Sequence, residues 1–144
     1  MEKKFKKYHY LGVVIPEVPE FWKLTVLHML EKIDKEVRPK LMPRFVLNQM
    51  YDKAYGEDNE IINWFWYNKL NSLIKNVHII QIKQKFATLR VYGLLIPEIQ
   101  DLINKAMAQC DLICEFCGGT ETSHVMVKSW VRNLCVKCKE NSRK

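Results

Sequence analysis

Two cysteine pairs, Cys114-Glu115-Phe116-Cys117 and Cys135-Val136-Lys137-Cys138, decide how the C-terminal third of this chain folds. Seventeen residues separate the two pairs, a spacing typical of structural zinc sites. Two residues between paired cysteines let both sulfurs of a tight knuckle reach one ion at about 2.3 Å. The pattern therefore predicts one structural Zn²⁺ ion, with Cys114, Cys117, Cys135 and Cys138 as its ligands.

The ligand set indicates the role of the metal. Four cysteines fill a tetrahedral site and leave no open position for water or substrate, so we expect the zinc to stabilise structure. His124 is the nearby residue that would make a mixed ligand set, and we favour a surface histidine over a replacement ligand. A redox role suits the two pairs less well than metal binding does.

The segment before the first pair has the clearest helical periodicity in the chain. Pro97 begins it, and apolar residues then recur at spacings of three and four. The fifth cysteine completes this stripe, so we expect a buried core thiol rather than a fifth ligand. The stripe consists of Ile99, Leu102, Ile103, Ala106, Met107 and Cys110.

A β-hairpin is expected before that helix, over residues 77–83 and 88–92, because both stretches are rich in Val, Ile and Thr and end at turn or polar residues. Its bend is expected near Lys85-Phe86-Ala87. Helices are predicted over 22–37 and 60–75, the second capped by Asp58 or Asn59. Residues 39–58 should be irregular with a short helix over 45–54, and residues 8–15 should form a strand.

The fold class that follows is α+β, with three principal helices, a central β-hairpin and a C-terminal four-cysteine zinc ribbon. We expect an α+β domain over 1–110 and a zinc-ribbon module over 111–144, docked on it and ending in a basic tail. No apolar run approaches the roughly 18 residues that a membrane span needs, and the cysteines suggest no disulfides. We therefore expect a cytoplasmic protein without a membrane partner.

The aromatic run Trp64-Phe65-Trp66-Tyr67 is open to two interpretations. It can be a platform for stacking bases, or a core with a partly exposed rim. Consecutive helical residues point in different directions, so the four rings cannot face one ligand. We favour the core interpretation, with Phe65 and Trp66 on the packed side together with Ile62, Leu70 and Leu73.

The chain carries a formal net charge of +7, which suits phosphate-rich or acidic partners without requiring them. Cations near the zinc also favour the thiolate form of its ligands. A candidate face for phosphate or an acidic partner combines basic residues of the hairpin and the zinc module with a tryptophan that can stack. Its members are Lys83, Lys85, Arg90, Lys128, Trp130, Arg132, Lys137 and Lys139.

Residues 77–138 carry three motifs in a characteristic order. The first reads Gln81-Ile82-Lys83-Gln84-Lys85-Phe86-Ala87-Thr88-Leu89-Arg90-Val91-Tyr92, the second is Cys114-Glu115-Phe116-Cys117-Gly118, and the third is Trp130 followed by Leu134-Cys135-Val136-Lys137-Cys138. In this the chain resembles a family of small zinc-binding proteins of bacteriophages and prophages. Ala87 stands where that family usually has glycine, so a turn that needs positive φ would be strained and the bend is expected to shift. The resemblance implies a phage setting, with the host cytoplasm as location, and no particular reaction.

Three functions are consistent with these patterns. We favour non-catalytic binding to a host protein, either as an inhibitor of a defence system or as a regulator of host takeover, because no P-loop, nucleophile elbow or paired carboxylates occur. The alternative is a zinc-ribbon regulator that binds DNA or RNA. A degenerate HNH-like nuclease fits less well, since Ser123 precedes His124 where an Asp-His or His-His pair is expected. A role in the virion and a homodimer also remain open.

Overall fold

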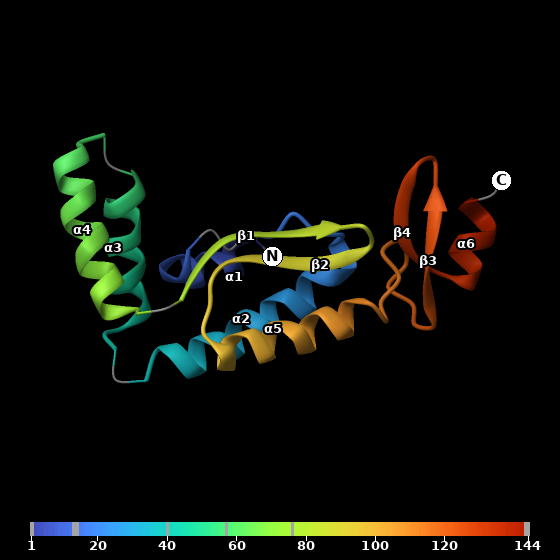
Figure 1. The fold of residues 1–144 in the computed structure, drawn as a ribbon, viewed down its shortest axis with the longest axis horizontal. Helices are drawn as coiled ribbons and strands as arrows, with labels where there is room; N and C mark the ends of the chain where they lie inside the picture. Colours follow the sequence, from blue (N-terminus) through green and yellow to red (C-terminus); the bar gives the residue numbers. More distant parts are fainter. Residues whose placement is uncertain (1, 13–14, 40, 57, 76, 143–144) are drawn as a thin grey trace.

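The computed structural model describes residues 2–12, 15–39, 41–56, 58–75 and 77–142. Figure 1 shows an elongated molecule with a helical pair at one end, a small module at the other and a mixed body between them. The elements are α1 (Glu2–Phe5), η1 (Lys6–Leu11), η2 (Glu20–Trp22), α2 (Lys23–Val37), α3 (Arg44–Gly56), α4 (Glu60–Leu73), β1 (His78–Lys85), β2 (Thr88–Leu94), α5 (Pro97–Cys110), β3 (Thr122–Val127), β4 (Trp130–Cys135) and α6 (Val136–Ser142). The α+β class is confirmed.

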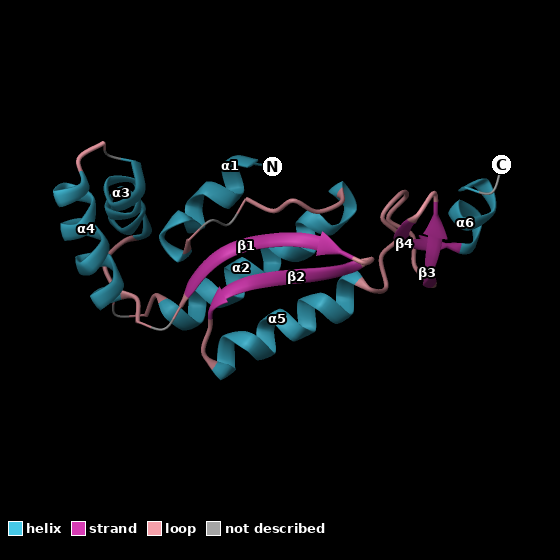
Figure 2. Ribbon diagram, turned by 45° about the horizontal axis from the view of Figure 1, so that its top comes forward, coloured by secondary structure: helices cyan, strands magenta, loops and turns pink. Residues whose placement is uncertain are grey.

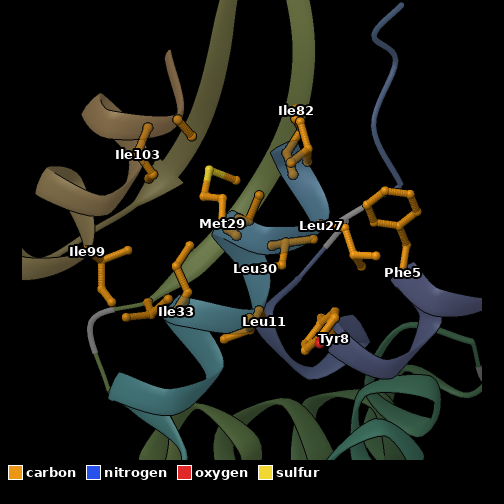
Figure 3. Close-up of a cluster of buried hydrophobic side chains, with 14 of the residues drawn as sticks. Phe5, Tyr8, Leu11, Leu27, Met29, Leu30, Ile33, Ile82, Ile99 and Ile103 are labelled. Atoms are coloured by element: carbon orange, nitrogen blue, oxygen red, sulfur yellow. The ribbon is translucent and has the colours of Figure 1, made fainter. Parts of the chain in front are cut away.

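The body is a two-layer arrangement in which the β1–β2 hairpin lies across α2 and α5 (Figure 2). The predicted stripe of α5 points into this layer, and Ile99, Ile103, Ala106 and Cys110 are buried. They belong to one core cluster with buried residues of α2 and β1, and Figure 3 shows Ile99 and Ile103 in this cluster with Met29 and Ile33 of α2 and Ile82 of β1. Cys110 is therefore a core thiol, as expected, and burial raises its pKa to about 12.

The central hairpin follows its predicted strands and turns at the predicted place. The antiparallel register pairs Lys85 with Thr88 and Lys83 with Arg90. The two residues of the bend, Phe86 and Ala87, have φ of 53° and 63°. The expectation that alanine would shift the bend is thus wrong: both residues adopt the left-handed region, which costs energy for side chains other than Gly, Asn and Asp.

The expected strand over 8–15 is wrong for its first part and partly outside the described residues, which omit 13 and 14. Lys6–Leu11 forms a 3₁₀ helix instead, and it buries Tyr8, Tyr10 and Leu11. The Tyr10 hydroxyl donates to the buried Asp34 carboxylate on α2, and this tertiary contact outweighs local strand propensity.

An extended strap, residues 12 and 15–19, follows the 3₁₀ helix and runs beside β1. It makes isolated parallel bridges from Gly12 to Ile79 and from Glu17 to Lys83. Gly12 is required there, since a Cβ would lie 2.1 Å from the Ile79 carbonyl oxygen. The Glu17 N–H donates to the Ile82 carbonyl at 2.9 Å, so the strap covers the outer edge of β1.

The helices α3 and α4 pack as an antiparallel pair that projects from the body (Figure 1), and we call this pair the arm. Asn59 caps α4, as predicted: its side chain accepts from the N–H groups of Ile61 and Ile62 at 2.9 and 3.3 Å. Helix α3 is longer than the short helix expected over 45–54. Leu70 is the buried residue of α4, so the core interpretation of its apolar side is wrong for Ile62 and Phe65, which are both exposed.

Candidate metal centre and binding surfaces

The structure brings Cys114, Cys117, Cys135 and Cys138 together, with all four Sγ atoms within 4.8 Å of one another. The Sγ atoms of Cys117 and Cys135 are 3.6 Å apart. A tetrahedral ion with metal–sulfur bonds of about 2.3 Å separates its ligand sulfurs by about 3.8 Å. The cluster therefore has the donor atoms and the size to hold one metal ion.

The first pair sits in a tight knuckle that points backbone N–H groups at sulfur. Gly118 turns the chain at φ of 77°, and the Gly119 N–H donates to Cys117 Sγ at 3.4 Å. Burial acts to raise the pKa of Cys114, but backbone N–H groups of Cys135 and Cys117 outweigh it and lower that pKa to about 7. This environment favours the thiolate, which is the form that binds metal.

The second pair is placed by the β3–β4 hairpin. Cys135 ends β4, and Cys138 lies in the first turn of α6. Three residues apart at a helix start, the two side chains fall on one side. The tight bend between the strands, Lys128-Ser129, has φ of 47° and 71°. It returns β4 to the knuckle, so that all four ligands meet.

The buried side chain of Asn133 joins this module to the end of α5. Its Nδ2 donates to the carbonyls of Cys110, Asp111 and Ile113 at 3.2, 2.9 and 3.1 Å. These carbonyls lie at and just beyond the last residue of α5, where the backbone donors of the helix run out. The Trp22 indole N–H adds a bond to the Ile113 carbonyl at 3.0 Å. Polar contacts therefore seat the module on the body.

Glu115, inside the knuckle, makes a second connection to the body. Its side chain is 4% exposed and lies 3.4 Å from Arg132 Nη1, and it accepts from Gln84 Nε2 of β1 at 2.6 Å. Arg132 was predicted to contact phosphate, but the structure gives its charge a carboxylate partner within the module.

The eight residues of the predicted basic face are spread over the two hairpins and α6. Lys83, Lys85 and Arg90 share the outer face of the β1–β2 hairpin, since they occupy alternate positions in register. Gln84, which reaches the zinc module, belongs to the opposite face. Of the remaining five, Lys128 lies in the β3–β4 bend, Trp130 and Arg132 lie on β4, and Lys137 and Lys139 lie on α6.

A groove of about 810 Å³ lies between the strap and the zinc module. Pro16 and Val18 line one side, and Phe116, Val127 and Leu134 line the other. Sequence reasoning missed this groove because its walls come from segments about a hundred residues apart. The cysteine motif predicted the zinc module, but it carried no information about the path of the strap.

A stripe of exposed apolar side chains on α4 includes two rings of the aromatic run, Trp64 and Phe65, for which we favoured a core interpretation from the sequence. Ile61, Trp64 and Phe65 are 79%, 69% and 54% exposed. Their spacing of i, i+3 and i+4 places them on one side of the helix. Trp66 points elsewhere and lies under the Lys53 and Lys69 ammonium groups, at 4.6 and 5.5 Å from its ring centroid.

His124 lies on β3, and its Nε2 is 3.8 Å from Asp111 Oδ1. It is not one of the side chains that cluster with the four sulfurs. Within the described ranges, no other group of three or more His, Cys, Asp or Glu side chains meets as a metal site.

Comparisons with protein-family models, curated proteins and solved structures give no match to this chain. Among the described residues, no helix has the length and apolar character that crossing a membrane requires.

Proposed function

We propose that this chain is a non-catalytic binding protein that recognises another protein through the arm, while a single structural zinc ion holds the C-terminal module together. The observation that supports this proposal most directly is the exposed stripe of Ile61, Trp64 and Phe65 on α4. Large aromatic side chains that gather on one exposed face are typical of protein interfaces.

The spacing of the stripe suits a defined recognition mode. A helix that presents apolar anchors at i, i+3 and i+4 can lie in an apolar groove of a partner. The arm projects from the body (Figure 1), so α4 is accessible along its outer side. Burial of these side chains would contribute about 1.5–3 kcal/mol for each one that becomes fully covered, which is a sizeable part of a micromolar affinity.

The zinc centre supports a non-catalytic assignment for the module. Four thiolates complete a tetrahedral zinc ion, and no coordination position is left for a reacting water. The knuckle amides and the lowered pKa of Cys114 fit a thiolate ligand at that one position. The resemblance to phage and prophage proteins then makes a host protein the partner, and inhibition of a defence system or redirection of a host process the consequence.

The test is an affinity capture of the tagged, zinc-loaded chain from host lysate, with and without nuclease treatment. The variant Trp64→Ser/Phe65→Ser removes the stripe. A matched control, Leu94→Ser/Met126→Ser, removes two exposed apolar side chains from other parts of the molecule. We expect one stoichiometric protein that survives nuclease, is retained by the control and is lost from the stripe variant.

Loss of every partner after nuclease treatment would overturn the proposal. Equal retention by the wild type and the stripe variant would also overturn it, because the bound protein would then use another surface. The nuclease alternative makes a separate prediction: divalent-metal-dependent DNA cleavage that His124→Ala abolishes.

A further inference from the structure

The outer face of the β1–β2 hairpin carries a set of side chains that the protein-binding arm does not use. Alternation along the strands puts Ile82, Leu89 and Val91 on the inner face, where they pack against the core. The residues between them point outward. In register, the outward pairs are Gln81 with Tyr92, Lys83 with Arg90, and Lys85 with Thr88.

The charges on this face are not compensated by the fold. Lys83 lies directly opposite Arg90, and like charges in that position destabilise a sheet. Neither they nor Lys85 form an ion pair with any described residue. Strands β1 and β2 contain no Asp or Glu. Glu17 of the neighbouring strap is the adjoining carboxylate, so the face keeps a net positive charge.

An aromatic ring lies among these cations. Tyr92 is 40% exposed, and the Lys83 ammonium is 5.6 Å from its ring centroid. A planar exposed ring beside several cations matches a chain of phosphates with unstacked bases, since bases stack on aromatic rings and phosphates attract the cations. A duplex offers the phosphates but keeps its bases stacked on one another.

We propose that the outer face of the β1–β2 hairpin binds single-stranded nucleic acid, with Lys83, Lys85 and Arg90 contacting phosphates and Tyr92 stacking on a base. The site is separate from the α4 stripe, so its test does not depend on whether the arm binds a protein partner. The repulsion between Lys83 and Arg90 would be relieved by a phosphate between them.

The experiment measures fluorescence anisotropy of a labelled oligouridine and a labelled oligothymidine, each about 12 nucleotides long, against the full zinc-loaded chain from about 50 to 200 mM salt. A duplex of mixed sequence and a polyglutamate competitor complete the set. The variant is Lys83→Gln/Arg90→Gln. The control, Lys32→Gln/Lys35→Gln, removes the same charge from exposed positions of α2.

We expect the single strands to bind more tightly than the duplex, and the two oligonucleotides to show whether RNA or DNA is preferred. Each lost phosphate contact on a single strand lowers the slope of log K against log salt by about 0.7. The hairpin variant should therefore lose about 1.4 from the slope, and the control should keep it.

The stacking contact has a different signature. Tyr92→Leu should weaken binding by about tenfold with the salt slope unchanged, because a base–aromatic contact is lost and no charge changes. Glu17→Gln should strengthen binding, since it removes the adjoining carboxylate.

The proposal is overturned if neither oligonucleotide binds at about 50 mM salt, or if the hairpin variant and the control lose the same slope. Displacement of the oligonucleotide by polyglutamate at equal charge concentration, with Tyr92→Leu behaving as wild type, would instead assign the face to acidic proteins.

Discussion

The two ends of the molecule reach stability by different routes. Among the described residues of the zinc module, the buried side chains are Cys114, Glu115, Asn133 and Leu134, and one of these four is a large hydrocarbon. In the arm, Leu47, Met50 and Leu70 are buried and belong to the same apolar cluster as the core of the body, while large apolar side chains cover the outside of α4. The module thus has a small, largely polar interior and depends on its metal. The arm has an apolar interior and also exposes apolar side chains to solvent.

The difference indicates which further interaction would stabilise each region. A segment of some thirty residues buries too little apolar surface to fold alone and needs a metal or a disulfide. The helical pair is held by the apolar core that it shares with the body, but an exposed aromatic stripe gains free energy when another surface covers it. A bound metal stabilises the fold of the module, whereas we infer that a protein partner covers the exposed stripe of the arm.

The largest effect is expected from removing the metal. Chelation, or Cys135→Ser, should unfold residues 114–138, because zinc binding supplies about 10–16 kcal/mol that is partly folding energy. Hydrogen exchange should show lost protection in β3 and β4 and unchanged protection in α3 and α4. Equal loss in both regions would show that the two ends are not independent.

The next largest effect concerns the polar connection between module and body. Asn133→Asp replaces an N–H₂ group that donates to three carbonyls with a buried acceptor, so we expect a cost of about 3–5 kcal/mol. Asn133→Ala removes the bonds without adding charge and should cost less. Denaturant unfolding of the zinc-loaded chain measures both, and an Asp variant as stable as the Ala variant would contradict this account of the contact.

In the arm, burial should decide the cost of truncation. Leu70→Ala opens a cavity in the apolar core that the arm shares with the body and should destabilise the protein by about 2–5 kcal/mol. Trp64→Ala removes a larger side chain that is exposed, and the change should stay within about 0.5 kcal/mol. Thermal unfolding of the two variants gives the comparison, and a large loss for Trp64→Ala would mean that this ring is packed in solution.

The smallest effect is a gain at the tip of the central hairpin. Phe86 is 65% exposed at a φ of 53°. Asparagine tolerates this conformation better than phenylalanine, so Phe86→Asn should stabilise the protein by about 0.5–1 kcal/mol. A denaturation midpoint that falls instead would show that the Phe86 ring makes a contact the fold needs.

Features that local chemistry determines could be predicted from the sequence. The spacing of Cys114, Cys117, Cys135 and Cys138 was enough to anticipate the cluster, because a knuckle is a local structure. The stripe ending at Cys110 and the cap at Asn59 were found for the same reason. The period of an amphipathic helix and the chemistry of its first turn do not depend on distant residues.

Features that depend on distant neighbours could not be predicted. The strand pattern before Gly12 gave way to a 3₁₀ helix because the Tyr10 hydroxyl meets Asp34 on another element. The periodicity of α4 indicated an apolar side but not whether a second layer covers it, so Phe65 was assigned to the core. Arg132 was assigned to phosphate because nothing in the sequence shows that Glu115 folds back beside it.

The most direct test of the account is native mass spectrometry of the purified chain and of two variants. The account predicts one zinc ion per chain in the wild type, one in Cys110→Ser, and none in Cys117→Ser. It would be contradicted by a wild type purified from zinc-supplied cells that carries no zinc, or by zinc loss from Cys110→Ser equal to that from Cys117→Ser.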